Sequence, residues 1–102
     1  MSWADKYIEE LKAGKEVSFR PQGNSMVGRI SSGQLVTCVP VEERVIKVDD
    51  IVLCKVMGTQ YLHLVLEVTS EVYPMCYRIG NNRGKVNGWT STVYGIVVDV
   101  KD

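Results

Sequence analysis

FRPQGNSMVGRISSG, residues 19–33, is the stretch that most constrains both the fold and the chemistry of this chain. Ser25 lies in it directly after Gly23-Asn24, and a second glycine follows at Gly28. Glycines permit backbone angles that other residues avoid, so such a segment can turn sharply and point consecutive N–H groups at one spot. Oxyanion holes are often built in this way. The stretch is compatible with a catalytic serine turn or with an ordinary Gly/Asn/Ser turn.

The length and the charge balance limit the classes of function. A chain of 102 residues predicts one domain with a core of useful size. Twelve Lys and Arg balance twelve Asp and Glu without a block of like charge, which argues against nucleic acid and membrane partners. No apolar run approaches the ~20 residues that span a bilayer, and no signal-peptide pattern opens the chain. We therefore expect a soluble, cytoplasmic protein whose partner is a peptide or a protein.

The cysteines and the one histidine bound the metal and redox chemistry. Cys38, Cys54 and Cys76 are odd in number, widely spaced and free of any CxxC pair. Neither a disulfide framework nor a Cys/His zinc site is indicated. Each cysteine lies in an apolar, strand-like run, which is typical of a small buried hydrophobe. The sequence predicts no metal and no other cofactor.

The first residues predict an amphipathic helix over residues 3–13. Ser2 and Asp5 resemble a capping box, and Gly14 is suitably placed to end the helix. Apolar side chains recur at helical spacing at Trp3, Tyr7, Ile8 and Leu11. We expect a helical region, residues 1–14, packed on a β region, residues 15–102, within one domain; a partner-binding helix is the alternative.

After Gly14 the pattern changes to period two and to β-branched residues, which favours strands to the end of the chain. Residues 57–60 indicate a hairpin connection, and residues 80–92, rich in Asn and Gly, indicate a polar loop. Several short strands with frequent turns predict a mostly β fold, a small curled barrel or a sandwich. The expected strands are residues 17–20, 34–39, 45–48, 51–56, 61–68, 73–79 and 93–100.

His63 is the only histidine, and it lies in an otherwise apolar strand. On alternation it shares a face with Tyr61 and Val65, so it points into the core or into a groove on the sheet. A lone strand histidine is often structural. However, a serine nucleophile needs a base near neutral pH, and imidazole titrates in that range. His63 is the one candidate that the chain offers to Ser25.

The order of these features resembles the serine endopeptidases that include signal peptidases and the LexA-like self-cleaving repressors. Gly23-Asn24-Ser25-Met26 looks like the nucleophile box of that family, and Leu62-His63-Leu64-Val65 falls where the family carries its lysine or histidine base. Four weaker matches lie in order along the chain, at residues 32–36, 49–52, 80–82 and 93–97. The resemblance implies a partly open, mostly antiparallel β-barrel.

For the site, the resemblance implies Ser25 as nucleophile, His63 as general base and the Ser25 backbone N–H as an oxyanion donor. It implies substrate contacts from the neighbours of Ser25 in the nucleophile box, which are Gly23, Asn24 and Met26. The substrate would be a peptide segment lying extended beside a strand.

The departures from the family pattern concern the third catalytic member. Histidine-type members carry an aspartate near the loop that residues 80–82 match, whereas residues 80–92 contain no carboxylate. Asn81 replaces the aspartate of the family's Gly-Asp-Asn motif, and Gly28 stands where proline is usual. The third member is therefore absent, an asparagine such as Asn81, or a residue supplied from elsewhere. An asparagine can hold an imidazole tautomer but stabilises the imidazolium less than a carboxylate does.

Two alternatives to an endopeptidase remain open. The chain has neither the transmembrane anchor of signal peptidases nor the DNA-binding domain of LexA-like proteins, which favours a small stand-alone member of the kind carried by a phage. A catalytically silent member would keep the fold as a binding or assembly module, or as a homodimer through sheet edges. A nucleic-acid-binding barrel lacks support, because the chain has no basic excess and its aromatic residues are scattered.

Overall fold

The computed structural model of the chain describes residues 2–69 and 74–102. In this part of the chain a helix is followed by strands and one 3-10 turn, so the expectation of a mostly β chain with an N-terminal helix is confirmed. The elements are α1 (Asp5–Lys12), β1 (Val17–Phe19), β2 (Leu35–Pro40), η1 (Val41–Glu43), β3 (Ile51–Val56), β4 (Thr59–Thr69), β5 (Cys76–Gly80), β6 (Val86–Thr90) and β7 (Val93–Lys101).

Helix α1 is shorter than the predicted span of residues 3–13, because the chain before Asp5 is a turn. The Asp5 carboxylate accepts hydrogen bonds from the backbone N–H and the hydroxyl of Ser2, at 3.1 and 3.0 Å. At the other end, the N–H groups of Gly14 and Lys15 each donate to carbonyls of the last turn at 3.0 Å. This pair of bonds is the Schellman motif, so Gly14 ends the helix as predicted.

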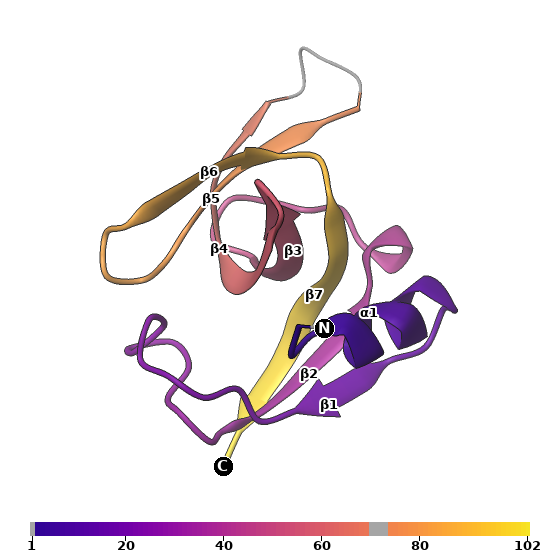
Figure 1. Ribbon diagram of the computed structural model, residues 1–102, viewed down its shortest axis with the longest axis vertical. Coiled ribbons are helices and arrows are strands. Elements are labelled where there is room, and N and C mark those ends of the chain that lie inside the picture. Colours follow the sequence, from indigo (N-terminus) through magenta and orange to yellow (C-terminus); the bar gives the residue numbers. More distant parts are fainter. Residues whose placement is uncertain (1, 70–73) are drawn as a thin grey trace.

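The strands of the described residues form one antiparallel sheet in the order β1-β2-β7-β3-β4-β5-β6. Its edge strands, β1 and β6, do not pair with each other there, so the sheet is not closed into a barrel. We expected a partly open barrel, and of that expectation the antiparallel sheet is confirmed. Register shifts between neighbouring strands, which bend the chain, give it its curl. Figure 1 shows the hairpin β5–β6 next to β4 and β3. The curl brings β6 to β3, where Thr90 Oγ1 donates to the Lys55 carbonyl at 2.6 Å.

The predicted strands differ from the observed strands in three places. The expected strand 45–48 is irregular chain after η1 and pairs with no strand of the sheet in the described residues. Val45 and Val48, which a buried strand would cover, are 80% and 53% exposed. Strand β6 was predicted to be part of the polar loop 80–92. The expected strand 73–79 is β5, which begins at Cys76; Tyr73 lies outside the described residues.

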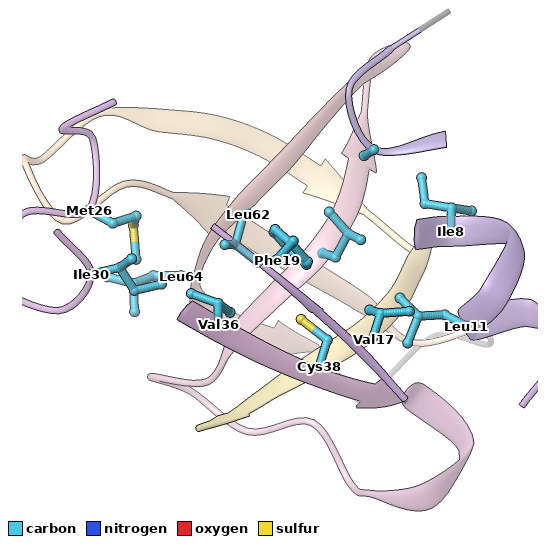
Figure 2. Packing of buried hydrophobic residues seen from close by; sticks show 12 residues of the cluster. Ile8, Leu11, Val17, Phe19, Met26, Ile30, Val36, Cys38, Leu62 and Leu64 are labelled. Carbon is cyan, nitrogen blue, oxygen red and sulfur yellow. The ribbon is translucent and has the colours of Figure 1, made fainter. Parts of the chain in front are cut away.

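Two buried clusters lie on opposite faces of β3 and β4. Leu62 and Leu64 of β4 belong to the first cluster, whereas Val65 belongs to the second, as period-two alternation requires. Figure 2 shows the first cluster, where side chains of α1 and β1 gather together with Met26 and Ile30 from the long loop after β1. That loop is therefore fixed to the core through two apolar residues on either side of an exposed turn.

Candidate active site

The segment that carries Ser25 is a helical turn anchored at both ends. The N–H groups of Arg29 and Ile30 donate to the Met26 carbonyl at 2.9 and 2.7 Å, and the side chains of Met26 and Ile30 are buried. Gly23, just before the turn, has a φ of 110°, a backbone conformation that favours glycine. The geometry fixes Ser25 at the first residues of the turn, where backbone N–H groups have no partner within a helix.

A second loop holds this turn against the sheet. The Asn82 backbone N–H donates to the Ser25 carbonyl at 3.0 Å, and its side-chain amide donates to the Val27 carbonyl at 2.8 Å. Gly28 allows this approach, since a Cβ there would lie 2.9 Å from the Asn82 amide nitrogen. Asn82, in the turn between β5 and β6, thus positions the main chain of the serine. Both loops extend to the same side in Figure 1.

Ser25, His63 and Asn87 form a continuous hydrogen-bonded line. Ser25 Oγ lies 3.2 Å from His63 Nε2, and Asn87 Oδ1 lies 2.6 Å from His63 Nδ1. His63 comes from β4, where it pairs with Val52 of β3, and Asn87 comes from β6. The ring of Tyr61 stacks on the imidazole with centroids 4.9 Å apart. The structure therefore brings together the two residues that the sequence singled out and adds a third.

The partner on each ring nitrogen defines the tautomer of His63. A carbonyl oxygen only accepts hydrogen bonds, so the Asn87 Oδ1 contact requires the proton to be on Nδ1. The lone pair of Nε2 then faces Ser25 and can accept the hydroxyl proton. This is the tautomer that a general base needs in a serine nucleophile site.

The surroundings of His63 favour its neutral form. Burial lowers the pKa of His63 below its ordinary value; the hydrogen bond with Asn87 acts in the opposite direction, and the Lys85 charge lowers the pKa further. No carboxylate among the described residues hydrogen-bonds to the ring. The imidazole is thus available as a base at neutral pH, while the imidazolium that forms on proton transfer lacks a counter-charge.

Asn81, which we named as the candidate third member if an asparagine fills that role, has another role. Its Oδ1 accepts the backbone N–H groups of Arg83 and Lys85 at 2.8 and 3.0 Å, and so shapes the turn of hairpin β5–β6. It makes no hydrogen bond to His63, so the expectation for Asn81 is wrong. Asn87 was missed because residues 80–92 were interpreted as a loop, in which side-chain direction does not follow from alternation.

Ser25 and His63 lie in the wall of a cleft of about 500 Å³. Of the neighbours that we expected to contact a substrate, Gly23 and Met26 line this cleft. Asn24 does not; its carbonyl accepts from the Val27 N–H at 3.3 Å within the turn. Gly23 and Met26 are therefore positioned to contact an occupant of the cleft, Asn24 is not, and the substrate contact itself stays a prediction.

Cys38 and Cys54 do not line this cleft. Cys38 and Cys54 are buried, and burial raises the pKa of each thiol to about 12, which suppresses the reactive thiolate. Among residues 2–69 and 74–102, no three His, Cys, Asp or Glu side chains gather as a metal site. No helix in those residues is long and apolar enough to cross a membrane.

Comparison of the chain with protein-family models and with curated proteins finds no match.

Proposed function

We propose that this chain is a serine endopeptidase of the LexA and signal peptidase type, with Ser25 as nucleophile and His63 as general base. One observation carries the proposal: Ser25 Oγ, the two nitrogens of His63 and Asn87 Oδ1 lie in hydrogen-bonded order at the wall of a cleft. The sequence resemblance supports the same proposal, and the mostly β chain with one antiparallel sheet and an N-terminal helix agrees with it at the level of fold class. Asn87, rather than Asn81, is the orienting residue of the proposed triad.

The chemistry follows from the protonation states. Ser25 Oγ attacks the peptide carbonyl carbon while its proton passes to His63 Nε2. The Ser25 backbone N–H stabilises the oxyanion that forms on the carbonyl oxygen. The His63 imidazolium then protonates the leaving amine, and a water molecule, deprotonated by neutral His63, hydrolyses the acyl-enzyme. Asn87 holds Nδ1–H throughout, so that Nε2 keeps its lone pair toward Ser25.

A serine-reactive phosphonofluoridate probe tests the nucleophile directly. Wild type should be labelled on Ser25, while Ser25→Ala and His63→Ala should not. Ser31→Ala is the matched control, since Ser31 is an exposed serine of the same cleft wall with no link to His63. Labelling of wild type no faster than of Ser25→Ala would contradict the proposal.

A catalytically silent peptide-binding domain is the second candidate. The observation that favours it is the neutral Asn87 at the position where a carboxylate would stabilise the imidazolium. Probe labelling of wild type and the melting temperature of His63→Ala together distinguish the endopeptidase from the silent binding domain. If wild type is inert toward the probe and His63→Ala mainly lowers the melting temperature, then His63 is a structural residue and the binding function is favoured.

A further inference from the structure

Much of the lining of the cleft that contains Ser25 and His63 is aromatic and aliphatic. Tyr7 of α1, Phe19 of β1, and Tyr61 and Leu62 of β4 line it, together with Met26 beside Ser25. The volume of about 500 Å³ falls in the range of sites that bury most of a small ligand. The same cleft contains Ser25 and His63, so whatever occupies it lies next to the nucleophile.

Ring contacts and one side-chain hydrogen bond hold this lining together. The rings of Tyr7 and Phe19 stack with centroids 4.5 Å apart, and Trp3 lies 5.7 Å from Phe19. Gln60 Nε2 donates to Asp5 Oδ1 at 2.9 Å, which joins α1 to β4 beside the cleft that Gln60 lines. A rigid apolar wall binds a side chain with less loss of conformational freedom than a wall that must first be ordered.

The charges of the cleft disfavour a cationic occupant. None of its described lining residues is a carboxylate, so a lysine or arginine side chain would enter without a counter-charge. Arg20 is the one permanently charged lining residue, and its Nη1 already donates to the Gly33 carbonyl at 2.7 Å. Gln60 Oε1 is buried and has no partner within the described residues, so it offers an acceptor to an N–H group.

We infer that this cleft is a specificity pocket for an aromatic or large aliphatic side chain of a peptide, adjacent to the bond that Ser25 attacks. The inference rests on the proposed function for the position of the bond, and on the lining for the choice of side chain. The peptide, rather than a free apolar molecule, is the occupant because the pocket adjoins the nucleophile and the edge strand β1 ends in it at Phe19.

Binding without chemistry tests the pocket separately from catalysis. The protein is the full chain carrying Ser25→Ala and Trp89→Phe, which leaves Trp3, at the cleft, as the reporter of intrinsic fluorescence. The probes are acetyl-Ala-Xaa-Ala amides with Phe, Leu, Ala or Lys at Xaa. We expect the Phe and Leu peptides to bind at least about tenfold more tightly than the Ala and Lys peptides.

Ser31→Phe, placed in the same background, should fill the pocket from its exposed rim and lower the affinity for the Phe peptide at least about tenfold. Ser91→Phe is the matched control, an exposed serine that does not line the cleft, and should leave the affinity unchanged. Equal affinities across the four peptides, binding of none at millimolar concentration, or an equal effect of the two Phe variants would each overturn the pocket. Selective binding alongside an inert wild type would support the pocket and refute only the endopeptidase.

Discussion

Two asparagines six residues apart, Asn81 and Asn87, show how position in a hairpin decides what one side chain does. Asn81 lies in the turn between β5 and β6, and its oxygen is occupied by two backbone N–H groups of that turn. Asn87 lies within β6, and its oxygen faces His63 Nδ1 at 2.6 Å. The same amide therefore builds backbone in one region and orients an imidazole in the other.

The strongest test of this difference is to give each asparagine a charge. Asn87→Asp should raise the rate of the proposed hydrolysis by about 10–10²-fold at pH 8, because a carboxylate beside Nδ1–H stabilises the imidazolium in the transition state. The gain is below the loss known for the reverse change in serine proteases, since the productive tautomer is already present here. The rate of probe labelling or peptide cleavage measures it.

Asn81→Asp is the matched control for that experiment. It retains an oxygen that accepts the two turn N–H groups and adds the same charge to the same hairpin. We expect the rate to change less than about twofold, because residue 81 makes no hydrogen bond to His63. A rate increase from Asn81→Asp that equals or exceeds the increase from Asn87→Asp would restore Asn81 as the orienting residue.

Much of the fold was predictable because it depends on local pattern. Period-two alternation marked β3, β4 and β7, and Gly14 marked the end of the helix. Strand β6 was not predictable in this way, since its sequence VNGWT contains Asn and Gly, which strands disfavour, and its pairing with β5 supplies the missing preference. Ile46 alone is buried in residues 45–48, and β-branched composition there did not make a strand.

The residues of the candidate site also differ in whether the sequence alone could identify them. Ser25 and His63 were identifiable because a serine turn between glycines and a single histidine are chemically distinctive in the sequence. Asn87 was not, because its role depends on the register that places β6 beside β5 and the sheet's curl over β3. Interpreting residues 81–85 as a hairpin turn would have brought Asn87 into consideration.

Removing the side chains should separate rate from stability. Asn87→Ala leaves Nδ1–H without its acceptor, so the rate should fall about tenfold or more as the productive tautomer and ring orientation are lost. Asn81→Ala leaves two turn N–H groups without a partner and should lower the free energy of unfolding by about 1 kcal/mol with little effect on rate. Urea denaturation and the labelling rate measure the two effects; identical phenotypes would remove the distinction.

The smallest effect concerns the pH dependence of stability. Burial lowers the pKa of His63 in the folded state relative to about 6.5 in the unfolded chain. Between those two values the unfolded state binds more protons than the folded state, so the free energy of unfolding falls on acidification from about pH 6.5 toward the folded pKa. Above about pH 6.5 the contribution of this residue to the free energy of unfolding is constant. His63→Gln, which cannot titrate, should lose that slope in urea denaturation across pH 5–7.

Asn87→Asp should reverse the sign of the slope of unfolding free energy against pH, because a carboxylate beside the ring raises the folded pKa of His63 and makes the charged ring the stabilised form. Asn81→Asp should leave the slope as in wild type, since the added charge has no hydrogen bond to the ring. A wild-type slope that persists in His63→Gln would assign the pH dependence to the acidic side chains and not to this histidine.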